Sequence, residues 1–563
     1  MKKKSLYIVV LTFFQMSVSV GQVIDVGTPI VEEQLRRLQL TSDSAIHYSF
    51  FKRPLNMSYF GHTLMKDHWF GNSILSQKSF KLIFLNARVD LDFNSNHPYE
   101  RNNGNFNPAK GLQYRRSIGL YAKWEFIEIQ VKPDWLFAQN EDYEGFSEAK
   151  GQRIWWTRYN WWTYADHPEQ HGATDEWRLR PGQSYLKFNY RKFSLGLSSQ
   201  NLWWGPGKKN SLLMTNAAEG FWHLSLETQM PIDTKIGTFE GQFIGGILNN
   251  SDYSPPDTLR QYGGKTNLYV PFRDAERYLS GIHISYQPKW VEGLFFGFSY
   301  VNQQYLEDAQ DNGDMLAALT DVFSRNEGID DRMRPDRYAS LSLRWIWKEA
   351  HAEVYFEGGK NKFQGFKEFL MVPEKDAGFV LGFNKLFDLP RPNNFLEVGM
   401  ELTKLAQSTD YSLAELNSWY LDQNIRHGYT HKGQWIGAGI GPGSNLATID
   451  LSWLNTDYKL GLVLERALHN SDFYYLAFAH NRDWNKYWVD YSIGIQGYTQ
   501  IKDLMIQGSI TRITSLNYQW VNIRNNPDDD YIRPGNDLLN WNFNLSVIYH
   551  LPTKRRQKKE KRA

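Results

Sequence analysis

The chain contains no cysteine among its 563 residues. Disulfide bridges, thiolate metal sites, a catalytic cysteine and lipid attachment at an N-terminal cysteine are therefore excluded. An excess of one charge sign is also missing, because 63 Lys and Arg offset 61 Asp and Glu to a net charge of +2. Nothing in this balance favours a nucleic-acid partner.

Long hydrophobic runs are missing after the N-terminus. One short apolar run extends from Leu6 to about Val20 behind three lysines, and the small residues Ser19 and Gly21 precede Gln22. This pattern predicts a secretory signal peptide over residues 1–21. The alternative, a transmembrane anchor, would need about 20 apolar residues. No later stretch reaches about 18 apolar residues, so the sequence predicts no helical membrane span.

Aromatic residues, in contrast, are abundant. They make up 15% of a chain whose hydrophobic content is only 41%. This combination suits an outer-membrane β-barrel, where lipid-facing residues alternate with polar lumen residues and aromatic girdles mark both membrane interfaces. A soluble carbohydrate-active β protein could share this composition, so the strand pattern must discriminate between the two.

Strands with a period of two begin near residue 81. Leu120, Ala122 and Trp124 alternate with polar residues, and the phase switches near Phe126. A phase switch without a Gly/Pro cluster predicts a very tight hairpin, and the same device recurs at Arg191-Lys192.

The connections between these strands alternate in length, and this alternation predicts an antiparallel transmembrane barrel of about 18 strands over residues 81–551. Bacterial barrels have short periplasmic turns, long extracellular loops and an even strand number. We therefore assign Phe473–Ala479 to an outer loop, since a strand there would make the number odd. Short connections fall near 191–192, 231–235, 288–293, 348–351, 387–394, 455–457 and 499–503, and long ones near 138–183, 202–221, 249–277, 306–336, 359–375, 406–445, 468–485 and 515–539.

Two further segments flank the predicted barrel. Residues 22–80 precede it and include the stretch VEEQLRRLQL, whose leucines form one helical stripe. We expect a short amphipathic helix there, on the periplasmic side and outside the barrel. Residues 552–563 carry seven Lys or Arg in twelve positions, which predicts a disordered basic tail. The alternative for this tail is an electrostatic contact with anionic envelope material.

No motif indicates catalysis, a metal or a cofactor. His167 and His171, like His427 and His431, are four residues apart, but nearby proline and glycine predict loops and not a metal-binding helix. The glycine-rich stretch 437–445 lacks the Gly-Lys-Ser/Thr ending of a phosphate loop, and it could instead fold inward and close the lumen. We expect no catalytic constellation, no metal site and no cofactor.

Two aromatic stretches are candidate polysaccharide-binding sites. Tryptophan faces stack on sugar rings, while Arg, Lys and Asn bond hydroxyl groups and acidic sugars. The alternatives are an interfacial girdle and plain loop packing. We expect Gly205-Pro206-Gly207 to fold the second stretch over the barrel mouth. The candidates are Trp155, Trp156, Arg158, Trp161 and Trp162 in the first loop, and Trp203, Trp204, Lys208 and Asn210 in the second.

Eight stretches, in order along the chain, together resemble the Wzi family of capsule-assembly outer-membrane proteins. The resemblance implies an 18-stranded barrel with a small periplasmic helical element, a surface lectin-like role and no enzyme activity. The stretches are LRRLQL (35–40), KRPL (52–55), FNSNHPYERNNG (93–104), NLWWGPGKKNSLLMTNAAEGFWH (201–223), RYLSGIHISYQPKW (277–290), SWY (418–420), GYTHKGQWIGAGIGPGSN (428–445) and YWVDYS (487–492).

These observations lead to one main prediction and two alternatives. We expect a non-enzymatic protein of the outer membrane that binds and organises capsular or other surface polysaccharide. Its partners would be the polysaccharide, outer-membrane lipid and, as a further expectation, export machinery, with no nucleic acid. The alternatives are a porin for sugars or other solutes and an enzyme acting on lipid or glycan, for which no lead residues are visible.

Overall fold

The computed structural model describes residues 23–42, 47–56, 72–76, 79–99, 101–172, 174–321, 334–407, 418–455, 457–478, 486–521 and 537–549. The signal peptide predicted over residues 1–21 and the basic tail predicted over 552–563 lie outside the described residues. Within them, no helix is both long and apolar enough to span a bilayer.

A single antiparallel sheet dominates the molecule. Five barrel strands are interrupted, and each of these consists of two consecutive elements joined by 'with' below. With each interrupted strand counted once, the described ranges contain eighteen barrel strands, as the sequence predicts. The strands are β5 (Phe80–Phe84) with β6 (Ala87–Asn94), β7 (Gly111–Ser117) with β8 (Leu120–Trp124), β9 (Ile127–Val131) with β10 (Asp134–Ala138), β11 (Glu176–Arg180) with β12 (Tyr185–Tyr190), β13 (Phe193–Ser198), β15 (His223–Thr228) with β16 (Ile232–Asp233), β17 (Gly237–Leu248), β20 (Arg277–Pro288), β21 (Leu294–Tyr305), β22 (Asp336–Trp347), β23 (Ala352–Asn361), β24 (Ala377–Asp388), β25 (Phe395–Lys404), β28 (Asn445–Leu454), β29 (Tyr458–His469), β30 (Trp488–Ile501), β31 (Leu504–Leu516) and β32 (Leu538–Tyr549).

The sheet closes on itself, which leaves no exposed edge across the membrane. Strand β32 pairs antiparallel with β6, from Asn542 opposite Asn94 to Tyr549 opposite Ala87. The two predicted tight hairpins are confirmed. Trp124 pairs with Ile127 and Tyr190 pairs with Phe193, so each turn contains only two residues.

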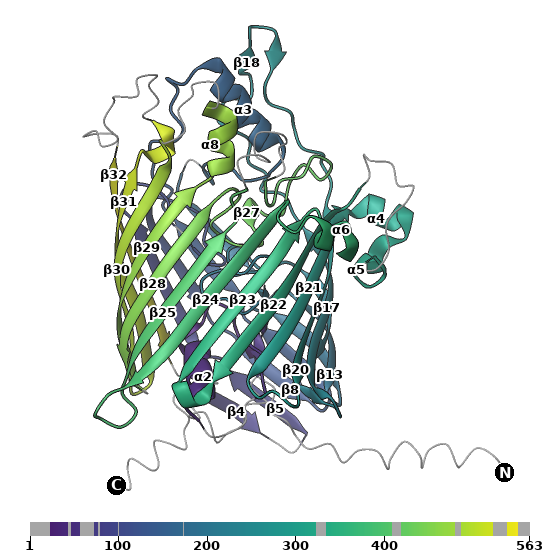
Figure 1. Cartoon of the computed structure of the whole chain (residues 1–563), viewed down its shortest axis with the longest axis vertical. Helices are drawn as coiled ribbons and strands as arrows, with labels where there is room; N and C mark the ends of the chain where they lie inside the picture. Colours follow the sequence, from purple (N-terminus) through teal and green to yellow (C-terminus); the bar gives the residue numbers. More distant parts are fainter. Residues whose placement is uncertain are drawn as a thin grey trace, which may run out of the picture.

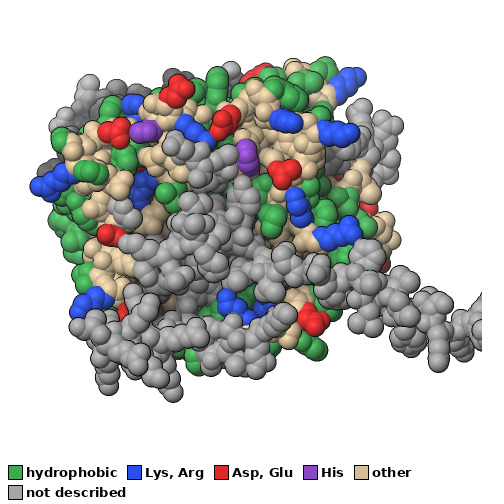
Figure 2. Space-filling view, turned by 90° about the horizontal axis from the view of Figure 1, so that it is seen from below, with side chains coloured by type: hydrophobic (Ala, Val, Ile, Leu, Met, Phe, Trp, Pro, Cys, Tyr) green, Lys and Arg blue, Asp and Glu red, His purple; other side chains and the backbone are tan. Residues whose placement is uncertain are grey.

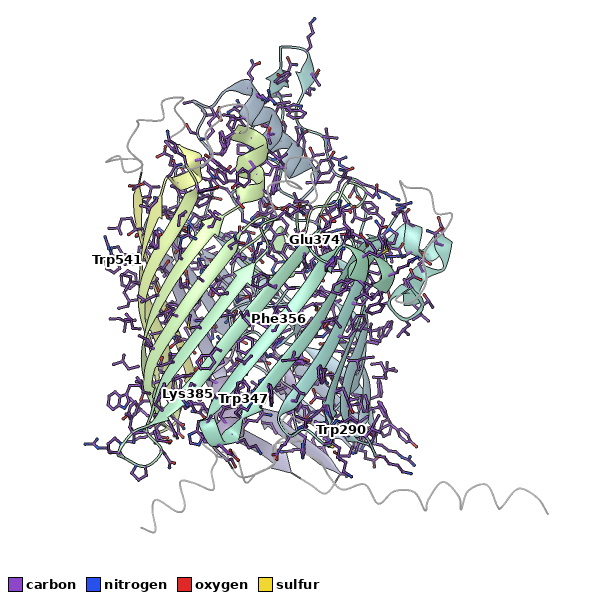
Figure 3. All side chains as sticks on the ribbon, viewed as in Figure 1. Trp290, Trp347, Phe356, Glu374, Lys385 and Trp541 are labelled. Carbon is purple, nitrogen blue, oxygen red and sulfur yellow. The ribbon has the colours of Figure 1, made fainter. Side chains whose placement is uncertain are left out.

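Alternation along each strand separates a lipid-facing surface from the lumen. In β12, Leu186, Phe188 and Tyr190 are exposed on the outside, whereas Lys187 and Asn189 are buried inside. Tryptophans mark both ends of the apolar wall: Figure 3 places Trp541 high on the barrel and Trp347 and Trp290 near its lower rim. This arrangement matches the aromatic girdles of outer-membrane barrels.

The two ends of the barrel differ, and the long loops gather at one of them. There Figure 1 shows the helices α3 and α8 above the strand ends, and α4, α5 and α6 at the upper flank of the barrel. Residues 471–478, assigned above to an outer excursion, form helix α8 and no strand. The elements of the long connections are α3 (Gln152–Thr163), β14 (Trp203–Trp204), β18 (Gln261–Tyr262), β19 (Thr266–Asn267), α4 (Leu306–Asn312), η2 (Asp314–Leu316), α5 (Ala317–Thr320), α6 (Phe366–Met371), β26 (Thr430–His431), β27 (Gln434–Trp435), α8 (Ser471–Phe478) and η6 (Tyr518–Trp520).

The N-terminal segment lies at the other end, which carries the short turns and, by the usual orientation, faces the periplasm. It contains β1 (Val23–Ile24), α2 (Pro29–Thr41), β2 (Lys52–Arg53) and β3 (Leu55–Asn56), while β4 (Asn72–Ser76) pairs with β5 and η4 (Lys348–Ala350) forms a short turn. Viewed from this end, the coloured side chains intersperse basic and acidic groups, and neither sign gathers in one patch (Figure 2).

The expected position of helix α2, outside the barrel, is wrong. Arg36 in α2 is 2% exposed, and its guanidinium donates to the carbonyl oxygen of Pro206, 2.9 Å away. Residues 47–56 continue upward inside the barrel, where the backbone N–H of Ser49 donates to Glu240. The amphipathic stripe therefore packs inside the periplasmic end of the lumen, because that position buries its apolar face and pairs Arg36 with the wall carboxylate of Glu353.

Candidate functional site

The loop that leads from β13 to β15 passes deep into the lumen. Its residues Trp203 and Trp204 form β14, which pairs antiparallel with β2 of the N-terminal segment. Trp204 is fully buried and its indole N–H donates to Gln242 at 2.8 Å. The guanidinium of Arg53 lies 4.8 Å from the Trp203 ring centroid. We call residues 199–222 the plug loop. The expectation that it folds over the barrel mouth is wrong.

Charge explains why this loop runs inward. Glu401 on the lumen face of β25 accepts backbone N–H bonds from Lys208 at 2.7 Å and Asn210 at 2.8 Å. The ammonium of Lys208 lies 3.2 Å from Glu397 and 3.7 Å from Glu353. Both glutamates stand near the periplasmic ends of their strands, so the tip of the plug loop reaches almost through the barrel.

The predicted sugar contacts of the second stretch lack an open surface in this structure. Trp203 is 4% exposed and Trp204 is not exposed at all, so neither ring face is open to a sugar. Lys208 is matched by two carboxylates, and Asn210 donates to the Thr403 hydroxyl at 3.1 Å. These side chains hold the plug loop against the barrel wall.

A second inward segment, residues 418–444, packs against the plug loop. The hydroxyl of Tyr420 donates to the Leu212 carbonyl and accepts from the Ala438 N–H, both at 2.8 Å. A Cβ at Gly437 would lie 2.4 Å from the Leu212 carbonyl oxygen, so the close approach requires glycine. The expectation that the glycine-rich stretch 437–445 folds into the lumen agrees with the structure.

The long-loop end is covered by an aromatic cluster, which we call the outer cap. It consists of α3, α8, η6 and Phe146. Phe473 of α8 lies 5.7 Å from Trp161 and 5.0 Å from Trp520, measured between ring centroids. These rings belong to one apolar core that continues downward to Trp204 and Leu212. The cap and the plug loop are therefore a single packed body.

Residues 153–162, predicted to lie in the first long outer connection, form a helix within it. Helix α3 buries Trp155 and Trp161 at 5% and 4% exposure, whereas Trp156 is 46% exposed. Trp162 is partly buried, and the guanidinium of Arg158 stacks over its ring at 4.6 Å. Arg158 also lies 3.5 Å from Glu169. Four of the five candidates in this stretch thus support the helix from within.

The remaining candidate, Trp156, lies on the solvent face of α3. Arg153 precedes it by three residues and Asn160 follows it by four, so all three side chains share one helical face. Arg153 is exposed and Asn160 is half-buried. One flat apolar ring between a cation and an amide is a suitable surface for a sugar ring with hydroxyl or carboxylate substituents.

The four paired histidines lie in buried loops beneath the cap. Burial lowers the pKa of His167 to about 4 and the pKa of His171 to about 3. Burial likewise lowers the pKa of His427 to about 3. Within the described part of the chain, no three His, Asp or Glu side chains come together as a metal site. The histidines are neutral packing groups at ordinary pH.

A cavity of about 380 Å³ remains beside the plug loop, against β6 and β28–β32. Its wall is polar and most of its charges are paired. Arg101 lies 2.6 Å from Glu465, and Arg115 lies 2.7 Å from Asp90. None of these residues was predicted from the sequence, although alternating charged residues on strands of a lumen wall are a usable signal.

The comparisons with known proteins agree with this architecture. The family model for capsule assembly protein Wzi matches residues 106–511. The chain belongs to the Wzi capsule-assembly family. Among curated proteins, no sequence matches it. A solved Wzi structure, described as an outer-membrane protein involved in group 1 capsule assembly in Escherichia coli and as a carbohydrate-binding β-barrel, shares 13% identity at a TM-score of 0.57. The match covers 94% of this chain and 100% of that one.

Two further solved structures are less similar to this Wzi-family chain. Pseudomonas aeruginosa OpdQ has 9% identity and a TM-score of 0.38, covering 83% of this chain and 97% of its own. Acinetobacter baumannii OccAB4 has 10% identity and a TM-score of 0.39, covering 84% and 98%. The family match and the Wzi structure together confirm the predicted family and the outer-membrane barrel class.

Proposed function

We propose that this protein binds capsular or related surface polysaccharide at the cell exterior and organises it there without chemical conversion. The observation that carries the proposal is the Trp156 face of α3, an exposed aromatic ring flanked by Arg153 and Asn160 on a helix whose other side is packed. A ring held on a rigid base loses little entropy when a sugar stacks on it. Membership of the capsule-assembly family also supports binding of a surface polysaccharide.

The filled lumen favours this proposal over the porin alternative. The plug loop, the 418–444 segment and residues 47–56 occupy the space through which a solute would pass. We expect the purified protein to be silent in planar bilayers. Sustained conductance of the native chain would favour the porin instead.

A binding assay with matched tryptophan variants tests the proposed site. Purified protein is titrated with a panel of acidic and neutral polysaccharides. Trp156→Ala should weaken binding about tenfold, because stacking on an aromatic face contributes on the order of 1 kcal/mol. Trp222→Ala is the matched control, since Trp222 is also 46% exposed but precedes the outward-facing residues of β15. Equal losses in both variants would contradict the assignment of Trp156.

A cellular experiment tests the role itself. Deletion of the gene should shift polysaccharide from the cell-attached to the shed fraction. Complementation with Trp156→Ala should restore attachment only in part. Unchanged attachment in the deletion strain would overturn the proposed function.

Contact with polysaccharide export machinery is a further part of the proposal. The short turns at the periplasmic end offer the surface for it. Cross-linking from a residue introduced at Lys348 in one such turn should capture an export component. Capture of no envelope protein would remove this partner from the proposal.

A further inference from the structure

Two of the long connections fold outward over the outer surface of the barrel, unlike the plug loop. We call residues 306–321 and 362–376 the flange; it contains α4, η2, α5 and α6. Figure 1 shows α4 and α5 beyond the edge of the barrel, beside β21. The hydroxyl of Ser280 accepts the backbone N–H of Ala318 at 3.2 Å, and the hydroxyl of Tyr278 donates to the carbonyl of Met315 at 2.8 Å.

The strand alternation shows that these contacts are on the outer side. Arg277 of β20 points into the lumen, where it donates to Gly428 and Thr430. Gly281 also faces inward, since a Cβ there would meet Trp204. Tyr278 and Ser280 lie between these positions and therefore face outward.

The flange buries the outer ends of the wall that would otherwise meet lipid. Tyr300 pairs with Ala339, and both face outward, yet they are 0% and 4% exposed. Nearer the middle of the same strands, the outward residues Ile284, Phe296 and Leu341 are exposed. The flange thus covers the wall near the outer ends of these strands and leaves their middle part to the lipid.

Aromatic rings hold the flange to the wall. Phe363 lies 5.9 Å from Tyr300, and Phe366 lies 5.6 Å from Phe298, measured between ring centroids. An ion pair adds to them, because Arg337 at the outer end of β22 lies 2.9 Å from Asp321. This packing fixes the flange against the barrel, and among the described residues several side chains on its other side are exposed.

Four large apolar side chains are exposed on the flange, although the outer side of α4 carries polar ones such as Glu307 and Asp311. Leu370 and Met371 at the end of α6 are 76% and 72% exposed, and Leu316 and Leu319 are also exposed. Lys367 is exposed one turn before Leu370 and Met371, on the same face of α6. Figure 3 places Glu374, just beyond α6, at about the height of the girdle residue Trp541. The apolar side chains therefore lie at the outer membrane interface.

We propose that the flange is a lipid-contact surface that rests in the headgroup region of the outer leaflet. Its exposed apolar side chains are continuous with the lipid-facing wall around Ile284 and Leu341, so the membrane that covers the wall also reaches the flange. Leucine and methionine beside a lysine suit this depth, because apolar side chains enter the acyl boundary while the ammonium stays among headgroups. The outer cap is thereby held upright above the membrane surface.

Single-cysteine labelling tests the proposal, since the natural chain has no cysteine of its own. Leu370→Cys and Met371→Cys are labelled with a small fluorophore and reconstituted into phosphatidylcholine vesicles. Some vesicles carry nitroxides near the headgroup end of the acyl chains. Phe356→Cys, in the middle of the wall, is the lipid-facing control. Leu259→Cys, which precedes the protruding β18–β19 hairpin and is 79% exposed, is the aqueous control.

The two outcomes are distinct. We expect nitroxide quenching at positions 370 and 371 to be at least about twofold greater than at position 259, with weak quenching by aqueous iodide. Quenching like that of position 259 would overturn the proposal. A Leu370→Cys disulfide dimer in the same vesicles would overturn it as well, because a second copy of the chain would then cover the flange.

Discussion

The two ends of the lumen are closed by different chemistry. At the outer end, the cap packs Trp155, Trp161, Phe473 and Trp520 into an apolar core. At the periplasmic end, the closure is ionic: Arg344 lies 2.5 Å from Glu353, and the charges of α2 and of the plug-loop tip join the same group. Apolar packing closes the outer end, and ion pairs close the periplasmic end.

The two kinds of closure contribute differently to the stability of the protein and to the placement of the plug loop. Apolar burial is non-directional, so an aromatic cap tolerates small shifts of its helices. A buried ion pair stabilises little against an apolar substitute, but breaking it is costly, and it accepts only one arrangement of its partners. The periplasmic network therefore fixes where the plug loop lies, while the outer cap contributes buried aromatic rings.

The largest effect is expected from Glu353→Ala. This change leaves Arg344, Arg36 and Lys208 without their shared carboxylate in a buried site, which typically costs about 3–5 kcal/mol. Urea unfolding in lipid vesicles measures the loss, and bilayer conductance should appear as the plug loop loosens. The exposed Glu374→Ala is the control and should change stability by less than about 0.5 kcal/mol. A stable, silent Glu353→Ala protein would break the proposed division between the two ends.

A smaller and more local effect is expected from Phe473→Ala in the outer cap. The deletion removes ring contacts to Phe146, Trp161 and Trp520 and should cost about 3 kcal/mol. Limited proteolysis of loop 138–175 should rise, and the change should not depend on salt concentration. Tyr262→Ala, on the exposed hairpin, serves as the control. Opening of the barrel to ions by Phe473→Ala would mean that the ends do not act separately.

The smallest effect is a shift in pH dependence from His171→Phe. Burial holds the pKa of His171 near 3, whereas the ordinary value is 6.5. When the cap opens below pH 6.5, this histidine gains a proton, so its contribution to cap stability is lost as the pH falls from 6.5 toward 3. When the cap opens, the variant should take up about one proton fewer than wild type. Hydrogen exchange at several pH values measures this difference.

Asp472 changes the stability of the cap with pH in the opposite direction to His171. The effect of the histidine is therefore measured as the difference between the variant and wild type. Burial raises its pKa to about 6, so its contribution favours the closed cap at low pH and is lost as the pH rises through 6. His351→Phe, on a periplasmic turn far from the cap, is the control for the histidine variant. Identical pH profiles for His171→Phe and wild type would show that the histidine is not buried in solution.

The barrel could be predicted from the sequence because its rules are local. Period-two alternation and the length of each connection follow from neighbouring residues alone, and the hairpins at 125–126 and 191–192 match the phase switches. The direction in which a long connection folds is not local. Whether the plug loop covers the mouth or enters the lumen depends on charges supplied by strands far away in the sequence.

A usable signal for the plug was nevertheless present. Strands β23 and β25 each carry two glutamates four residues apart, which places both on the lumen face. Unpaired carboxylates in a narrow lumen predict basic partners, and the chain offers them in two short stretches. The glutamates are Glu353, Glu357, Glu397 and Glu401, and the basic pairs are Arg36-Arg37 and Lys208-Lys209, of which Arg36 and Lys208 lie near Glu353. Helix α3 was missed because its four tryptophans suggested a binding loop, although the buried residues Ile154, Thr157 and Trp161 recur at helical spacing.

The seam between β6 and β32 has a consequence for biogenesis. It joins residues near 90 to residues near 545, so the wall cannot close before almost the whole polypeptide has been delivered. The N-terminal segment already lies inside the finished wall and pairs with β14. The last strand of the chain therefore completes the cylinder around a segment that precedes the first barrel strand. Pairing over such a sequence separation is intrinsically slow.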